Sequence, residues 1–366
     1  PARLSGRIGV SLITGSGRMT TQPLQNGDFL HLTLQHPDGL APIHFNLPDN
    51  TAVSVWDTGV ICFEPRQPGS KDIVLSCGVH GNETAPIEIC AELVQDVLTG
   101  KLTLAHRLLV LFGNPAAINA GTREITENLN RLFSGHHSMG AGLINAERKR
   151  AKALEDYVSR FYNEVRVTGL VPRNRYLYDL HTAIRDSRFE KFAVYPYLHD
   201  KPWQKAEFEF LQACDVTTVL LMQTPTSTFS YYASNSHGAN AFTIELGKVQ
   251  PFGQNDMRRF SKARAALRQL ISEERVNTVP FDEQQFQLYQ VYRAINKQTQ
   301  EFKLHFADDV QNFTAYPQGT LLATDGDTEY RVEREGEAII FPNAKVAIGQ
   351  RAMLMVIPTT VQHNLA

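Results

Sequence analysis

Short apolar runs alternate with helix-periodic segments through the middle of this chain. The apolar runs have the length of buried strands, whereas the other segments repeat apolar residues every three or four positions, as amphipathic helices do. Strands are predicted at 72–77, 107–112, 175–183, 189–197, 216–222 and 239–247. Helices are predicted at 87–98, 145–165, 203–213 and about 255–274. This alternation predicts an α/β domain with a mixed open sheet flanked by helices.

The N-terminal region departs from this alternation. Residues 1–25 are rich in Gly, Ser and Arg and show no clear period, so we expect a disordered extension without function, with Met19 as a candidate natural start. Residues 29–63 carry short alternating runs broken by Pro and Gly, including 29–34 and 51–55. These runs predict antiparallel edge strands that lead into the central sheet.

The C-terminal region, residues 279–366, shows a third sequence pattern. Its short alternating runs are separated by Gly, Asp and Pro turns, and it contains no cluster of metal ligands or nucleophiles. We therefore predict a small C-terminal antiparallel β domain that follows an α/β domain at 26–278. The runs lie at 302–306, 320–324, 330–333, 338–341 and 352–357.

Composition and charge argue against nucleic acid and membranes as partners. The 366 residues are 42% hydrophobic and 20% charged, with a formal net charge of -2. Such a chain has no long-range attraction for nucleic acid or an anionic membrane, and no apolar run approaches the roughly 20 residues of a membrane span. The four cysteines form no CxxC pair, so we expect reduced thiols, no disulfide and a cytoplasmic location. A homo-oligomer is compatible with the sequence.

The chemistry is centred on residues 76–86, between a predicted strand and a predicted helix. His80 and Glu83 stand there on a strand-to-helix loop, where open α/β sheets place their ligands. An imidazole and a carboxylate three positions apart can bind one cation and leave a single protein ligand missing from a catalytic zinc site. The alternative is a chance spacing in which Glu83 only favours the helix N-terminus.

A second strand end offers the missing ligand. Asp179 and His181 alternate along one strand, so both side chains point to the same side. His181 is a candidate third ligand, and Asp179 is a candidate acceptor that would fix its tautomer. The alternative is a neutral histidine in the protein core.

Two further groups carry candidate chemistry. Arg123, Asn130 and Arg131 gather in one short stretch, where arginines can grip a carboxylate or stabilise an oxyanion, although most arginines lie on the surface. Glu245 stands near the apolar end of the last predicted strand, where a carboxylate is costly unless it is paired or functional. Glu245 is therefore the candidate general base, with a salt-bridged structural role as the alternative.

These motifs together resemble the zinc carboxypeptidase superfamily and, within it, the succinylglutamate desuccinylase and aspartoacylase branch. The resemblance covers about residues 50 to 360, and although each motif is weak alone, their order along the chain is specific. The motifs that carry it are Gly78-Val79-His80-Gly81-Asn82-Glu83-Thr84-Ala85-Pro86, Glu127-Asn128-Leu129-Asn130-Arg131-Leu132-Phe133, Asp179-Leu180-His181-Thr182-Ala183-Ile184-Arg185 and Ile244-Glu245-Leu246-Gly247-Lys248.

The resemblance implies a zinc-dependent hydrolase with a small-molecule substrate. It implies cleavage of N2-succinyl-L-glutamate to succinate and L-glutamate, the last step of the arginine succinyltransferase pathway. One Zn2+ per subunit would be held by His80, Glu83 and His181, with a fourth place for a water that zinc acidifies. Glu245 would accept the proton of that water and deliver it to the departing nitrogen.

The resemblance also assigns substrate contacts. Arg123 would face the developing oxyanion, and Asn130 with Arg131 would hold a substrate carboxylate. The substrate has three carboxylates, so Arg185 and Arg188, just beyond His181, are candidates for additional clamps, and Tyr231 stands where a substrate-contacting tyrosine is expected. The chain has Asn235 where aspartoacylases place an arginine, which counts against an aspartoacylase-type substrate.

Two other readings stay open at this point. One is a related N-acyl amino acid deacylase or a metallocarboxypeptidase, although the β domain is expected to cover the cleft and restrict it to small acyl amino acids. The other is an inactive zinc-binding protein that senses a carboxylated ligand. That reading needs a broken set of catalytic residues, whereas Glu245 and the three candidate ligands are all present.

Overall fold

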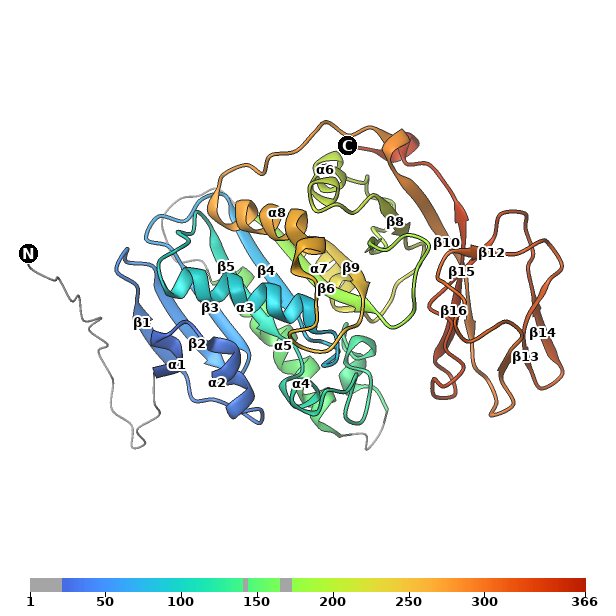
Figure 1. The fold of residues 1–366 in the computed structure, drawn as a ribbon, viewed down its shortest axis with the longest axis horizontal. Helices are drawn as coiled ribbons and strands as arrows, with labels where there is room; N and C mark the ends of the chain where they lie inside the picture. The colour runs from blue at the N-terminus through green and yellow to red at the C-terminus, as the bar shows by residue number, and fades with distance from the viewer. Residues whose placement is uncertain (1–21, 141–143, 165–172) are drawn as a thin grey trace, which may run out of the picture.

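The computed structural model describes residues 22–140, 144–164 and 173–366 (Figure 1). Most of the predicted N-terminal extension, residues 1–21, lies outside the described residues. Its last four residues form the short helix α1, so the prediction of disorder is wrong for them. Among the described residues, no helix is long and apolar enough to cross a membrane.

A 13-stranded mixed sheet forms the backbone of the molecule. Its strands, in spatial order, are β1 (Ile43–Asn46), β2 (Ala52–Asp57), β3 (Val60–Glu64), β5 (Arg107–Phe112), β4 (Lys71–Cys77), β6 (Asn174–Ala183), β9 (Asn240–Lys248), β7 (Phe192–Tyr195), β8 (Thr218–Leu221), β10 (Gln287–Asn296), β16 (Arg351–Pro358), β15 (Ala338–Ile340) and β12 (Thr314–Ala315). The predicted mixed open sheet is confirmed.

The central strands β5, β4, β6 and β9 pair in parallel, so their carboxyl ends meet at one edge. All six residues of β5 are buried, as expected of a parallel strand covered on both faces. On β4, Ile73 and Leu75 pack in one core cluster while Val74 packs in the other. This alternation explains why the sequence shows continuous apolar runs rather than a polar face.

Helices cover both faces of the sheet (Figure 1). Helices α3, α6 and α8 contribute to the core cluster that contains Ile73, whereas α5 and α7 contribute to the cluster that contains Val74. The helices are α1 (Gln22–Gln25), α2 (Phe29–Gln35), α3 (Thr84–Leu98), α4 (Pro115–Ala120), α5 (Ala146–Asn163), α6 (Lys205–Ala213), α7 (Phe229–His237) and α8 (Ser261–Ser272).

The C-terminal part contains the predicted antiparallel β structure. Strand β10 pairs in parallel with β8 and antiparallel with β16, so the large sheet continues into this part of the chain. A separate three-stranded sheet contains β11 (Lys303–Leu304), β13 (Leu321–Asp325) and β14 (Thr328–Arg331). Figure 1 shows these strands beside the end of the sheet that lies away from β1. The domain boundary at 278/279 stays a prediction.

One predicted strand is wrong, because residues 29–34 lie in helix α2. The Asp28 side chain accepts a hydrogen bond from the His31 backbone N–H at 3.0 Å and so caps the helix. The buried residues Phe29, Leu32 and Thr33 follow helical spacing, which resembles alternation over so short a run. The four cysteines are buried and free, in agreement with the expected reduced thiols.

Candidate metal centre and active site

The loop after β4 brings two candidate ligands to the carboxyl edge of the sheet. Strand β4 ends at Cys77 and α3 begins at Thr84, so His80 and Glu83 stand between them. The backbone of this loop passes directly against α4. A Cβ on Gly81 would lie 2.1 Å from the Ala117 carbonyl carbon, so only glycine fits this position.

His80, Glu83 and His181 come together as a buried cluster. Their candidate ligand atoms all lie within 4.8 Å of one another. The Glu83 carboxylate stands between the rings, with Oε1 at 2.9 Å from His80 Nδ1 and Oε2 at 2.9 Å from His181 Nδ1. The sequence-based prediction that these three residues share one site therefore agrees with the geometry.

The second nitrogen of each imidazole ring, Nε2, also has a partner. His181 Nε2 lies 2.7 Å from Asp179 Oδ2, so the predicted contact is present, and the role of Asp179 in fixing the tautomer stays a prediction. His80 Nε2 lies 3.0 Å from Asn128 Oδ1, and this oxygen also accepts the Asn130 backbone N–H at 3.0 Å. Asn128 received no role from sequence reasoning, although it lies inside the motif that supplied Asn130 and Arg131.

The donor set suits zinc. Two imidazoles and one carboxylate are a common set of protein ligands for catalytic zinc. In each histidine the partner on Nε2 fixes the ring, so that Nδ1 can face a cation. Burial, and then the positive charge of Arg123, lower the pKa of His80 to about 4, which leaves the ring neutral and able to bind a metal. Burial raises the pKa of Glu83, but His80 and His181 outweigh burial and hold it well below its usual value.

Glu245 lies beside this cluster on the neighbouring strand. Its Cα pairs with that of His181 across β9 and β6, and its side chain is buried. Burial raises the pKa of Glu245 to about 7, a rise that His181 opposes and Glu83 reinforces. Its Oε2 has no hydrogen-bond partner in the described part of the chain. A buried carboxylate with a free oxygen and a pKa near neutrality is suited to proton transfer.

The polar stretch before α5 lies next to the candidate ligands. An Arg123 guanidinium nitrogen donates to Glu83 Oε1 at 2.9 Å, and the side chain keeps 30% of its surface exposed. The buried Asn130 accepts the Phe229 backbone N–H through Oδ1 at 3.1 Å, which ties this stretch to α7. Arg131 is half-buried, and burial followed by the charge of Arg123 lowers its pKa to about 10.

The structure does not bring the remaining predicted contacts into this cluster. The Arg185 guanidinium donates to the backbone carbonyls of Pro342, Asp308 and Val310. Arg188 binds the Asn312 carbonyl through its own backbone N–H. The Tyr231 hydroxyl lies 3.0 Å from His199 Nε2. The predicted role of all three in substrate binding stays a prediction. Asn235, which stands where aspartoacylases place an arginine, is exposed on α7.

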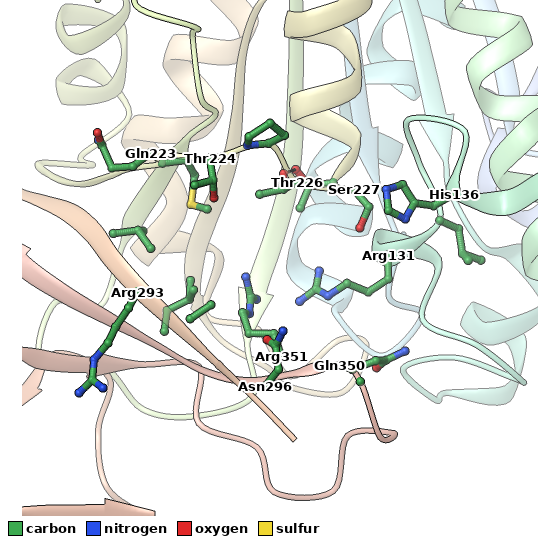
Figure 2. A pocket seen from close by; sticks show the side chains of 18 of the residues that line it. Arg131, His136, Gln223, Thr224, Thr226, Ser227, Arg293, Asn296, Gln350 and Arg351 are labelled. Atoms are coloured by element: carbon green, nitrogen blue, oxygen red, sulfur yellow. Dashed lines mark hydrogen bonds between the residues drawn. The ribbon is translucent and has the colours of Figure 1, made fainter. Parts of the chain in front are cut away.

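A pocket of about 710 Å³ opens between this stretch and the C-terminal strands (Figure 2). Its lining includes four arginines and the carboxylate of Glu127. Arg131 reaches it from the polar stretch and Arg351 from β16, as Figure 2 shows. Arg351 was missed from sequence, because nothing in its neighbourhood distinguishes it from a surface arginine. The other two arginines are Arg148 and Arg293.

Comparison with known proteins defines the class to which this fold and site belong. Residues 69–271 match the succinylglutamate desuccinylase/aspartoacylase catalytic domain, and residues 284–359 match the AstE/AspA barrel-sandwich hybrid domain. The chain belongs to the succinylglutamate desuccinylase/aspartoacylase family, whose members are hydrolases that act on an amide.

Three similar proteins carry the name succinylglutamate desuccinylase. The chain is 54% identical over 338 residues to a succinylglutamate desuccinylase of Shewanella amazonensis, covering 92% of this chain and 97% of the relative. It is 50% identical over 331 residues to one of Idiomarina loihiensis, covering 90% and 95%. A crystal structure of the succinylglutamate desuccinylase of Chromobacterium violaceum superposes with a TM-score of 0.78 at 40% identity, covering 91% and 98%.

Proposed function

We propose that this protein hydrolyses N2-succinyl-L-glutamate to succinate and L-glutamate in a zinc-dependent reaction. The observation that carries the proposal is the buried cluster of His80, Glu83 and His181 beside Glu245, in a chain 54% identical to a protein named succinylglutamate desuccinylase. With this activity the protein would act at the last step of the arginine succinyltransferase pathway, in the cytoplasm.

His80, Glu83 and His181 are the residues that would hold the ion. When bound there, zinc supplies a Lewis acid and lowers the pKa of a bound water toward about 7. The chain prepares this site in advance, because Asp179 and Asn128 fix the two rings from outside. The Thr182 backbone N–H also donates to Glu83 Oε2 at 3.0 Å, which holds the carboxylate in place.

Glu245 moves the proton. In its ionised form it accepts a proton from the water that attacks the amide carbonyl, which requires a base with a pKa near the working pH. It then donates that proton to the glutamate nitrogen as the carbon–nitrogen bond breaks, because an amine is a poor leaving group until it is protonated. Burial excludes bulk water from this exchange.

The arginines bind the negative charges of the substrate. Arg123 stands next to the ligands and is half-buried, so it can face the carbonyl oxygen as negative charge develops there. Arg131 lines the pocket next to Asn130, and its guanidinium offers a fork of N–H donors that can hold a carboxylate in two hydrogen bonds.

The test is release of L-glutamate from N2-succinylglutamate by purified protein loaded with zinc, stripped by a chelator and then reloaded. We expect activity that disappears on stripping and returns with zinc. Glu245→Gln tests the base separately from the metal, because it removes the carboxylate without removing a candidate ligand. It should lower kcat by about 10²- to 10⁴-fold with unchanged zinc content. Activity that survives both chelation and Glu245→Gln would overturn the proposal.

A further inference from the structure

We infer that Arg351, supplied by β16 of the C-terminal region, binds a carboxylate of the substrate together with Arg131. The inference rests on the proposed function and extends it to a residue outside the catalytic part of the chain. Arg131 and Arg351 lie 220 positions apart in sequence, yet both line the same pocket (Figure 2).

The four pocket arginines fall into two pairs. Arg148 is neutralised by Glu127, with two guanidinium nitrogens at 2.7 Å from the two carboxylate oxygens. Arg293 is neutralised by Glu333 at 2.7 Å and Glu337 at 2.9 Å. These two side chains are engaged in structural ion pairs, so they have little capacity left for a ligand.

Arg131 and Arg351 lack such partners. One guanidinium nitrogen of Arg131 donates to the Asn130 carbonyl at 2.9 Å, and no ion pair to a carboxylate forms in the described residues. The guanidinium of Arg351 makes no hydrogen bond or ion pair with any described residue and only approaches the Phe341 ring, at 5.8 Å from its centroid. The only acidic side chain that lines the described pocket, Glu127, is already paired with Arg148.

Arg351 is held close to charges of its own sign. Burial, then the charge of Arg131, then that of Arg123, lower its pKa well below the usual value. Half-buried cations that face one another destabilise the folded protein unless an anion comes between them. A protein that keeps such an arrangement at the edge of a pocket gains from it only when a negatively charged ligand is bound.

The position favours a substrate carboxylate as that anion. Arg123 contacts the Glu83 ligand, Arg131 follows it along the same stretch, and Arg351 faces Arg131 from the other wall of the pocket. N2-succinylglutamate carries three carboxylates, more than Asn130 and Arg131 can bind. A planar guanidinium suits this task, because it grips a carboxylate through two parallel hydrogen bonds.

The test compares zinc-loaded wild type, Arg351→Gln and Arg351→Lys on four substrates. They are N2-succinylglutamate and three analogues that each lack one carboxylate: N2-butyrylglutamate (acyl end), N2-succinylnorvaline (side chain) and N-succinyl-4-aminobutyrate (α position). Arg351→Gln should lower kcat/KM about 10- to 100-fold on the substrates that keep the bound carboxylate. On the analogue that lacks it, the loss should shrink to less than about threefold, and Arg351→Lys should recover part of the activity.

The control is Arg331→Gln, which removes one positive charge from the same region but at an exposed residue paired with Glu329. It should change kcat/KM by less than about twofold. An equal loss for Arg351→Gln on all four substrates, or no loss on any, would overturn the inference. The analogue on which the effect vanishes identifies the carboxylate that Arg351 binds.

Two readouts separate this inference from the proposed function. If wild type hydrolyses none of these substrates, the proposed function fails, and calorimetric titration with succinate and L-glutamate still tests the carboxylate site. Binding at least about fivefold weaker in Arg351→Gln for one of them supports the inference, and equal binding of both overturns it. In the ligand-free protein, Arg351→Gln should not lower Tm, whereas a purely structural arginine would lower it.

Discussion

At the residue scale, one carboxylate organises the site. Glu83 contacts both imidazoles, Arg123 and the Thr182 backbone N–H. The sequence pointed to Glu83, His80 and His181 because each lies in a local motif that follows or ends a strand. It could not identify Arg351, because the approach of Arg351 to Arg131 depends on how β16 pairs with β10. Neither of these strands lies near a recognised motif.

Asp179 gives a residue-scale prediction about the metal. Asp179→Asn keeps the shape of the side chain but removes the negative charge 2.7 Å from His181 Nε2. We expect zinc affinity to fall about 10- to 100-fold, because the ligand becomes less basic and less well oriented. Competition with a chromophoric chelator measures this change, and excess zinc should restore much of the activity. An unchanged affinity would show that Asp179 is not an orienting partner.

At the scale of elements, the sequence predicts long, strongly patterned segments well. The predicted strand at 107–112 coincides with β5, because Arg107 is followed by five apolar residues and the whole strand is buried. Helix α2 was predicted as a strand, since three buried residues are too few to distinguish the helical repeat from the alternation of a strand. Strand β10 was missed because its exposed, intermediate and buried positions are interleaved without a clear alternation.

Helix α6 carries a buried carboxylate that makes stability depend on pH. Glu207 is 3% exposed and accepts a hydrogen bond from the Tyr178 hydroxyl at 2.9 Å. Burial raises its pKa to about 7 from an ordinary value of 4.5, and the Tyr178 bond opposes the rise only in part. The folded state therefore binds the proton more tightly than the unfolded state does.

The sign of the pH dependence follows from this difference. The contribution of protonated Glu207 is fully present below pH 4.5 and is lost as the pH rises through about 7. The total is on the order of 3 kcal/mol. Glu207→Gln, which stays neutral, should be more stable than wild type at pH 8 and about equal to it at pH 5.

Urea unfolding of the zinc-loaded proteins at pH 5 and pH 8 measures this difference. The control is Glu335→Gln, which replaces an exposed carboxylate in the C-terminal region and should show the same pH dependence as wild type. If Glu207→Gln followed wild type at both pH values, Glu207 would not be the protonated group.

At the scale of the whole molecule, the C-terminal region is attached to the catalytic part through both the sheet and single side chains. The alternating runs predicted a small β domain, and the family resemblance implied that this domain covers the cleft. Neither gave any sign that β10 would pair with β8, because pairing between distant strands leaves no local pattern. The same distance hides the contacts of Arg185 with three carbonyls of that region.

Arg185→Ala tests this attachment. Removal of the guanidinium leaves the carbonyls of Pro342, Asp308 and Val310 without their donor, so we expect unfolding free energy to fall by about 1–3 kcal/mol. KM for the substrate should rise as well, since Arg351 belongs to the region that is loosened. Arg188→Ala is the matched control, because the hydrogen bond of Arg188 to the Asn312 carbonyl comes from its backbone N–H and survives the substitution. A larger loss of stability in Arg188→Ala would contradict this account.

The most direct test of the central claim is the selectivity of the zinc-loaded wild-type protein. It consists of kcat/KM values for N2-succinylglutamate, N-acetylaspartate and a dipeptide with a C-terminal glutamate, measured side by side. We predict that N2-succinylglutamate is preferred by at least about 100-fold, a difference of roughly 3 kcal/mol in transition-state binding. Preference for either of the other two would contradict the proposed substrate, and no hydrolysis of any would favour a protein that only binds carboxylated ligands.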